Sequence, residues 1–480
     1  MKQLTDFEPK RVFHYFEEIS AIPRGSGNCK AISDYCVSFA HKHGLQVIQD
    51  EAENVVIYKP ASFGYENADA VILQGHLDMV CQKTETSAVD FEKDGISVYA
   101  DGDFIKAKDT TLGADNGIAV AMILAILENK ELAHPPIEAV FTTDEEIGMV
   151  GAMQLDMGCL KGKKMINLDA EDPKTLTVSC AGGCDFTMKI PVVRHPAYGK
   201  KVILTIKGLQ GGHSGVEIHK GRLNANMLAG RILHYAKNIA DFAMVSIKGG
   251  DKGNAIPQSC TVEFLVQNPE VFCEKLRDYI AEVKEEISDR EQGFVAELVV
   301  TEETDVFVMD PSSRDALLFT LLCAPNGVVA MSASIDNLVE TSLNLGILST
   351  EEKEVTMLFS LRSNKKTAMK FLAEQLLQLA KQLHCDAEVS GEYPPWEYKK
   401  DSSLQRRYLE TYQEQFGVEP EVVAIHAGLE CGVFASAIQG LECIAIGPET
   451  LDVHTVLERL SISSTEQTYK LLLKLLEKCI

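Results

Sequence analysis

Residues 71–78 read Val-Ile-Leu-Gln-Gly-His-Leu-Asp, a short apolar run that ends in a histidine and an aspartate. Such a run is typical of a buried strand. A long apolar segment with the length of a helix follows over 114–127, and a second strand-like run follows over 137–143. Because strands and helices alternate, this part of the chain predicts an α/β fold with a mostly parallel, helix-covered sheet.

The same alternation extends on both sides of this stretch and returns near the C-terminus. Ser463-x-x-Glu466 has the pattern of a capping box and predicts the start of a final helix. The other elements expected in these two parts are helices over 9–20 and 32–44, and strands over 55–58, 164–168, 422–425 and 443–446.

The middle of the chain has a different character. Strand-like runs over 201–206, 262–266 and 355–361 alternate with amphipathic helices over 223–237 and 366–384. The pattern fits either two β/α layers in tandem or one larger α+β domain. The proline-containing segment 391–396 is a candidate hinge. We therefore predict a discontinuous catalytic domain, residues 1–185 and 397–480, and an inserted lid or substrate-binding domain, residues 186–396.

Charge and composition exclude several classes of protein. The chain of 480 residues is 45% hydrophobic, which argues against disorder. It has 46 basic and 70 acidic residues, a formal net charge of −24, so it would repel nucleic-acid backbones and anionic membranes. No apolar run is long enough for a membrane span or an export signal. Thirteen scattered cysteines indicate free thiols and a cytoplasmic compartment.

Acidic and histidine residues follow several predicted strands, where parallel sheets place their sites. Taken singly, each has an ordinary alternative: His76-Leu-Asp78 as a surface turn, Asp115 as a helix N-cap, Glu145-Glu146 as a solvated pair. Imidazole nitrogens and carboxylate oxygens are also the ligands of zinc, manganese and cobalt. Such residues at five element ends favour a metal site, in which Asp78 takes the second ring N–H of His76.

Several motifs together resemble a known family. Segments 75–80, 111–117, 142–148 and 167–169 are similar to those of the co-catalytic di-zinc peptidases. Segments 211–215, 253–257 and 426–432 narrow the resemblance to the branch of the aminoacyl-histidine dipeptidases, and it covers nearly the whole chain in order and spacing.

The resemblance implies two divalent ions, with zinc expected and cobalt or manganese as alternatives. Glu145 would be the general base, taking a proton from a solvent molecule and passing it to the leaving amine. Two extra acids, Glu171 and Asp172, compete with Asp169 as a ligand. The implied ligand set is His76 and Asp169 on one ion, Glu146 and His454 on the other, Asp115 bridging both, and Asp78 orienting His76.

The resemblance also places substrate-binding residues in the inserted domain and near it. His213 would stabilise the oxyanion, from its own chain or from a partner subunit, unless its glycine-rich turn only ends a strand. Arg362 would hold the substrate carboxylate, unless it is an ordinary strand-edge arginine. Asn254 would touch the substrate, and Gly428 and Glu430 would bind its N-terminal amine.

The resemblance implies a cytoplasmic metallodipeptidase that cleaves unblocked dipeptides, Xaa-His types such as β-Ala-His included. A homodimer through the inserted domain is expected, with no nucleic-acid or membrane partner. The alternatives within the same superfamily are a tripeptidase and an N-acyl-amino-acid deacylase. A non-catalytic peptide- or metal-binding protein on the same fold is a third alternative, which the presence of Glu145 beside every proposed ligand disfavours.

Overall fold

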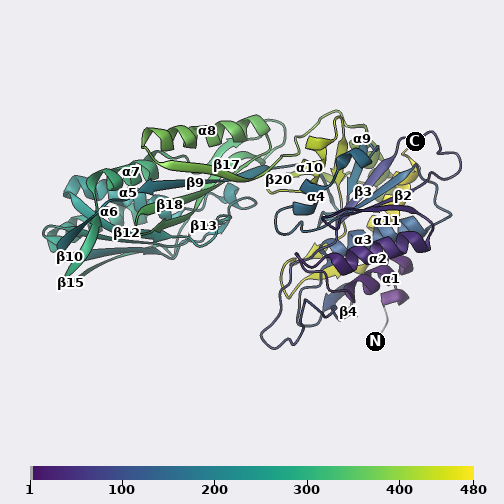
Figure 1. The fold of residues 1–480 in the computed structure, drawn as a ribbon, viewed down its shortest axis with the longest axis horizontal. Coiled ribbons are helices and arrows are strands. Elements are labelled where there is room, and N and C mark those ends of the chain that lie inside the picture. The colour runs from purple at the N-terminus through teal and green to yellow at the C-terminus, as the bar shows by residue number, and fades with distance from the viewer. Residues whose placement is uncertain (1–3, 480) are drawn as a thin grey trace. The chain divides into compact units, whose positions relative to one another are not determined.

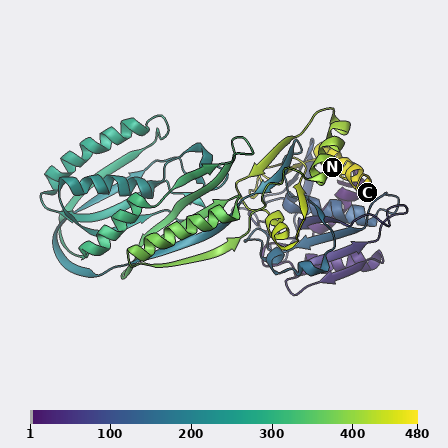
Figure 2. The same cartoon turned by 90° about the horizontal axis from the view of Figure 1, so that it is seen from above.

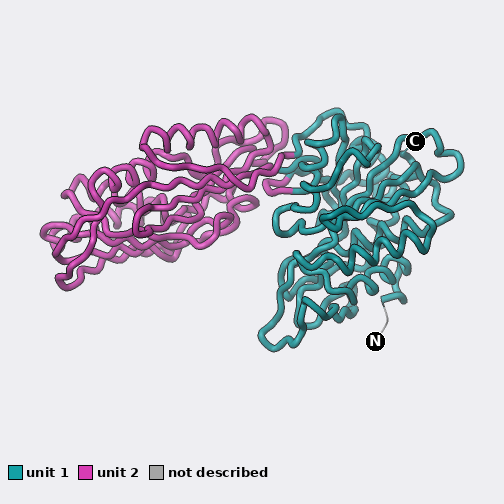
Figure 3. Tube along the Cα trace, viewed as in Figure 1, with its two compact units in different colours: residues 1–180, 396–424, 429–480 teal, residues 181–395, 425–428 magenta. Residues whose placement is uncertain are grey.

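The computed structural model describes residues 4–479, and the chain forms two compact units (Figure 3). Unit 1 contains Met1–Cys180, Trp396–Ala424 and Leu429–Ile480, and unit 2 contains Ala181–Pro395 and Ile425–Gly428. The chain thus leaves unit 2 within the proline-containing segment 391–396. The catalytic and lid roles expected for the two parts stay predictions.

Unit 1 is built on an eight-stranded sheet in the order β1-β2-β6-β3-β7-β21-β8-β20. The four central strands, β6, β3, β7 and β21, run parallel, whereas β1, β2 and β8 pair antiparallel with their neighbours. The α/β class is confirmed, and its parallel part is the centre of the sheet. The strands are β1 Gln46–Gln49, β2 Val55–Lys59, β3 Val71–His76, β6 Ile137–Thr142, β7 Lys164–Asn167, β8 Thr175–Cys180, β20 Glu421–Ile425 and β21 Glu442–Ala445.

Helices cover both faces of this sheet (Figure 1). Helix α3, Ala114–Glu128, packs on β3 and is buried along nearly its whole length. Its close approach requires Gly75, because a Cβ there would lie 2.9 Å from the Cβ of Ala119. In Figure 1, α1 Lys10–Ser20, α2 Lys30–Lys42 and α3 lie on one side, and α4 Val150–Gln154, α9 Ser403–Phe416 and α10 Glu430–Ala437 lie on the other.

The final helix begins two residues earlier than the sequence predicted. Helix α11, Ile462–Glu477, is capped by Ser461, whose side chain accepts a hydrogen bond from the N–H of Ser464. The predicted capping box at Ser463 and Glu466 is wrong, because both residues lie inside the helix. The short strand β23, Arg459–Ser461, ends at the cap and fixes where the helix can begin. It belongs to a small sheet with β22 Thr450–Leu451, β5 Phe104–Ala107 and β4 Val98–Asp101.

Unit 2 is built on a nine-stranded sheet whose neighbouring strands all pair antiparallel. One continuous sheet decides for one α+β domain and against two β/α layers in tandem. The strands are β9 Gly182–Pro191, β10 Arg194–Lys207, β12 Phe242–Gly249, β14 Cys260–Val266, β15 Val295–Met309, β16 Gly327–Met331, β17 Val339–Thr350, β18 Glu354–Ser363 and β19 Asp386–Tyr393.

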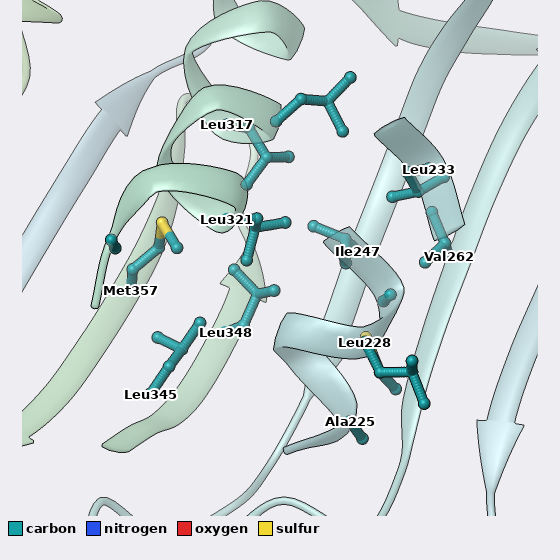
Figure 4. Close-up of a cluster of buried hydrophobic side chains, with 14 of the residues drawn as sticks. Ala225, Leu228, Leu233, Ile247, Val262, Leu317, Leu321, Leu345, Leu348 and Met357 are labelled. Carbon is teal, nitrogen blue, oxygen red and sulfur yellow. The ribbon is translucent and has the colours of Figure 1, made fainter. Parts of the chain in front are cut away.

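Four helices lie on one face of this sheet, as Figure 1 shows from the side and Figure 2 from above. They are α5 Ala225–Ile239, α6 Pro269–Ile287, α7 Pro311–Cys323 and α8 Lys366–Gln382. The core between helices and sheet is apolar, with Leu233 and Leu317 among its fully buried side chains (Figure 4). Helices α5 and α7 approach closely at Gly230, where a Cβ would lie 2.5 Å from the Cβ of Leu321.

Within residues 4–479, no helix is long and apolar enough to cross a membrane.

All thirteen cysteines lie in this range and none forms a disulfide. Cys180 and Cys184 are buried, and burial raises the pKa of each thiol to about 12. Such thiols stay protonated near neutral pH, which disfavours a metal-binding role for this pair.

Candidate metal centre

The candidate site lies in unit 1, at the carboxyl ends of three neighbouring strands. Because β6, β3 and β7 are parallel and adjacent, the residues that follow them meet at one edge of the sheet. His76 is the last residue of β3, Glu145 and Glu146 follow β6, and Asp169 follows β7. The side chain of Asn116 joins two of these ends, since it accepts a hydrogen bond from the N–H of His76 and donates one to the carbonyl of Leu168.

The carboxylate of Asp115 lies between two histidine rings. Its Oδ1 is 3.1 Å from Nε2 of His76, and its Oδ2 is 3.1 Å from Nε2 of His454. The Nε2 of His454 is also 2.9 Å from Oε1 of Glu146, and that of His76 is 3.6 Å from Oδ1 of Asp169. The five side chains therefore form two groups that share Asp115, one with His76 and Asp169 and the other with His454 and Glu146. We call each group a half-site. The pairing is the one that the family resemblance implied.

Asp78 lies next to the ring of His76. The two side chains are fully buried, and Oδ1 of Asp78 lies 3.4 Å from Nδ1 of His76. The same carboxylate accepts hydrogen bonds from the backbone N–H groups of Glu145 and Glu146 and from the hydroxyl of Ser26. Asp78 thus fixes both the ring of His76 and the loop that carries the two glutamates.

The histidines and carboxylates perturb one another strongly. Burial alone would lower the pKa of His76, but Asp169, Asp115 and Asp78 outweigh burial and raise this pKa well above its usual value. Hydrogen bonds to Asp115 and Glu146 raise the pKa of His454 to about 11. Burial and neighbouring carboxylates raise the pKa of Asp169 to about 7, although His76 opposes them. The site therefore concentrates negative charge that favours bound cations.

The surroundings of Glu145 raise the pKa of its side chain. Burial raises the pKa of its carboxyl group well above the usual value. The charge of His76 opposes this shift, and the carboxylates of Asp169, Glu430 and Glu146 reinforce it. A carboxylate with a raised pKa is a stronger base than an ordinary carboxylate, which suits a group that accepts a proton and later returns it.

The donor set fits a pair of divalent cations. Imidazole and carboxylate donors suit zinc, manganese or cobalt, and one carboxylate faces both half-sites. Within residues 4–479, the ligand atoms of His76, Asp115 and Glu146 lie within 4.8 Å of one another. Of the three competing acids, Asp169 lies beside His76, 3.6 Å from its Nε2. Burial and the charge of Asp115 raise the pKa of Glu171 to about 7, whereas the charge of His454 lowers it, so Glu171 also lies close to the site. The ligand roles of all these residues stay predictions.

A second polar cluster, formed by His213, Arg362 and His426, lies within unit 2. The Nδ1 of His213 accepts hydrogen bonds from the N–H groups of Gly215 and Val216, which leaves its Nε2 to carry the ring proton. Gly215 permits the close approach, because a Cβ there would lie 3.0 Å from Cε1 of His213 and 3.1 Å from Nε of Arg362. The carbonyl of His426 would be only 2.5 Å from that Cβ.

Arg362 is largely buried, and its guanidinium uses only some of its hydrogen-bond donors. Its Nη1 donates a hydrogen bond to the hydroxyl of Tyr393, at 3.0 Å. Its Nε is buried and has no hydrogen-bond partner among the described residues. A buried guanidinium with an unused donor is suited to a carboxylate ligand.

His426 is a member of this cluster that was not predicted as a site residue. Its Nε2 lies 2.7 Å from the hydroxyl of Ser342, and burial together with the charge of Arg362 lowers its pKa to about 3. The signal available in the sequence was its place at the start of the segment 426–432.

The remaining predicted substrate residues lie in different settings. Asn254 is exposed, and its carbonyl accepts a hydrogen bond from Ser214, next to His213. Gly428 lies in the loop between β20 and α10. Glu430 is fully buried, accepts hydrogen bonds from Gln74 and Thr142, and has a pKa that burial raises to about 7. This burial disfavours direct contact of Glu430 with a substrate amine.

Comparison with known proteins places this geometry in a family. Residues 72–478 match the model of peptidase family M20/M25/M40. The chain belongs to this family. It is 36% identical to the cytosol non-specific dipeptidase of Escherichia coli (strain K12) over 482 residues, which cover 100% of this chain and 99% of that protein.

Solved structures agree with this assignment. The crystal structure of an aminoacylhistidine dipeptidase from Vibrio alginolyticus superposes with a TM-score of 0.92 at 36% identity, covering 99% of this chain and 98% of that one. The aminopeptidase PepT from Bacillus cereus has a TM-score of 0.57 at 14% identity, covering 98% of this chain and 99% of that one. This second likeness shows a shared fold alone.

Metal binding is expected to release protons at pH 7. The raised pKa values of His76 and His454 keep both rings protonated at this pH, and a ring must lose its proton before it binds a metal ion. Asp169, with a pKa of about 7, is also partly protonated at this pH, so loading two ions should release roughly two to three protons per chain. Calorimetric titration of chelator-stripped protein with zinc, in weakly coordinating buffers of different ionisation enthalpy, measures this number. Heats that do not depend on the buffer would contradict the electrostatic description of the site.

Proposed function

We propose that the protein hydrolyses unblocked dipeptides in a metal-dependent reaction, with Xaa-His dipeptides such as β-Ala-His among its substrates. The observation that carries the proposal is the carboxylate of Asp115 between His76 and His454, next to the raised-pKa carboxylate of Glu145. The full-length similarity to a dipeptidase from E. coli and to one from V. alginolyticus supports the same reaction class.

The chain's own residues account for the proton transfers. Two divalent ions, when bound by the two half-sites, supply a lowered pKa for a solvent molecule and polarisation of the peptide carbonyl. Glu145 accepts the proton of the attacking solvent molecule and delivers it to the amine that leaves. Asp78 holds the loop of Glu145 and the ring of His76 in a fixed relation, so that base and ligands keep their geometry.

Residues of unit 2 are proposed to bind the substrate. Arg362 has a buried, unused Nε donor and would hold the substrate carboxylate. His213 presents an Nε2–H, because its Nδ1 accepts backbone hydrogen bonds, and it would stabilise the oxyanion. Asn254 and Gly428 stay proposed substrate contacts. For Glu430 we propose instead that its buried carboxylate supports the site through Gln74 and Thr142.

The metal ion, the oligomeric state and the cellular location of the protein are also proposed. Zinc is proposed as the resident ion, and the same donors also accept cobalt or manganese. A homodimer formed through the inserted domain and a cytoplasmic location complete the proposal. The name of the E. coli relative places that protein in the cytosol.

The reaction class is tested with a paired set of substrates. Protein stripped with a chelator should regain cleavage of β-Ala-His and Gly-Gly when zinc, manganese or cobalt is restored, and should release little acetate from N-acetyl-methionine. A tripeptide added to the set separates dipeptidase from tripeptidase activity. Faster cleavage of N-acetyl-methionine or of the tripeptide than of both dipeptides would overturn the proposed substrate class, and no cleavage of any substrate with any metal would overturn the reaction itself.

The role of Glu145 is tested by a comparison with its neighbour. Glu145→Gln should keep the protein's metal content and lower kcat by about 10²- to 10⁴-fold, because only the base is lost. Glu146→Gln is the matched variant and should lose an ion as well as activity, because Glu146 lies 2.9 Å from His454 in the second half-site. Metal content by atomic emission and steady-state kinetics separate the two effects. Unchanged turnover in Glu145→Gln would show that another group is the base.

A further inference from the structure

The loop before helix α3 is held by a buried carboxylate from far along the chain. Both oxygens of Glu458 accept backbone hydrogen bonds, from the N–H groups of Leu112 at 2.8 Å and Gly113 at 2.9 Å to Oε2, and from Ala114 at 2.8 Å and Asp115 at 3.3 Å to Oε1. Glu458 is only 4% exposed. These donors at the helix start would otherwise lack partners.

A buried guanidinium holds the same loop through its carbonyl. The Nη2 of Arg24 donates to the carbonyl of Gly113, and its Nη1 donates to the carbonyls of Leu77, at 3.0 Å, and Asp78, at 3.3 Å. Arg24 is 2% exposed. One side chain therefore ties the segment that carries His76 and Asp78 to the loop that carries Asp115.

The loop has glycines where Arg24 approaches. Gly113 has a φ of 67°, and a Cβ at this position would lie 2.6 Å from Nη2 of Arg24. A Cβ at Gly117 would lie 2.5 Å from the same atom. The glycines in this stretch therefore make room for the guanidinium, which no other residue type would do without a shift of the loop.

The two buried charges act on the residue that the two half-sites share. Asp115 does not have helical geometry, with φ −80° and ψ 108°, so the helix itself does not dictate where its carboxylate points. Glu458 holds the N–H of Asp115 and lies four residues after His454 in the sequence. The same segment thus supplies the second half-site's histidine and the support for the shared carboxylate.

We propose that Glu458 and Arg24 are positioning residues that fix the carboxylate of Asp115 between the two half-sites. Neither is a ligand, because their polar contacts are to backbone groups. The inference rests on the proposed two-metal site. Loss of either residue should lower the affinity of the site for its two metal ions. Groups that orient metal ligands usually contribute about 10- to 100-fold to metal affinity.

Glu458→Gln tests the proposal because it keeps the size of the side chain and replaces one acceptor oxygen with a donor. Titration of the stripped full-length protein with Co²⁺, followed by visible absorption, gives the number of ions bound and the affinity of each. In the wild type, one Co²⁺ ion is expected to bind less tightly than the other. We expect the affinity for this ion to fall by at least about 10-fold in Glu458→Gln, with an altered visible spectrum. Far-ultraviolet circular dichroism should still show cooperative unfolding of the variant.

Glu138→Gln is the matched control. Glu138 is also a buried glutamate, 3% exposed, and it accepts hydrogen bonds from the N–H groups of Lys161 and Gly162. It lies near the start of β6, at the opposite end of the strand from Glu145. This variant should bind Co²⁺ as the wild type does, whatever it loses in thermal stability. Equal Co²⁺ binding by Glu458→Gln, Glu138→Gln and the wild type would overturn the proposal.

Arg24→Lys is the second variant, which keeps the charge but lacks the fork that reaches three carbonyls. If Glu458→Gln fails to fold, Arg24→Lys should show the same weakened Co²⁺ step. Loss of folding in both variants would show that the two residues serve only to fold the chain, and would also overturn the proposal. A wild type that binds two Co²⁺ ions but cleaves no dipeptide would instead refute the proposed function and leave this inference standing.

Discussion

One carboxylate, that of Asp115, has to present its two oxygens to two histidine rings at the same time. This constraint accounts for where unit 1 places the residues of its candidate site. His76 is fixed at the end of a central strand, so Asp115 must reach it from the start of α3, and His454 must reach Asp115 from a segment near the C-terminus. The parallel order of β6, β3 and β7 then brings Glu145, Glu146 and Asp169 to the same edge without any long loop.

The arrangement has an electrostatic cost. Carboxyl groups gathered in a partly buried site repel one another, and burial with this repulsion raises the pKa of Asp169 to about 7. Imidazolium groups relieve the repulsion when protonated, and divalent cations relieve it more fully. Glu458 and Arg24 do not relieve this repulsion. Their hydrogen bonds satisfy backbone N–H and carbonyl groups next to Asp115 and leave its carboxylate available.

Sequence patterns were sufficient for the residues at strand ends. A strongly apolar run followed at once by His76 and Asp78, or by Glu145 and Glu146, indicates both the strand and the end at which chemistry occurs. The strands over 71–76 and 137–142 were therefore predicted closely, and the acids after them were placed correctly at one sheet edge.

Other features have no local signal in the sequence. Glu458 contacts backbone N–H groups more than 340 residues away in the chain, and backbone donors carry no residue pattern. Arg24 was missed for the same reason, since its partners are carbonyls. The single sheet of unit 2 depends on long-range antiparallel pairing, such as that of β9 with β18, which periodicity alone does not specify. The N-cap of α11 is Ser461 and not the predicted Ser463, because a short strand that was also not predicted ends at Ser461.

The most direct test of the shared-carboxylate account is anomalous diffraction at the zinc edge from a crystal of the zinc-loaded protein. The account predicts two peaks about 3.5–4 Å apart, on either side of Asp115, one beside His76 and Asp169 and the other beside His454 and Glu146. A single peak, or a second peak held by Glu171 or Asp172 and out of reach of Asp115, would contradict it.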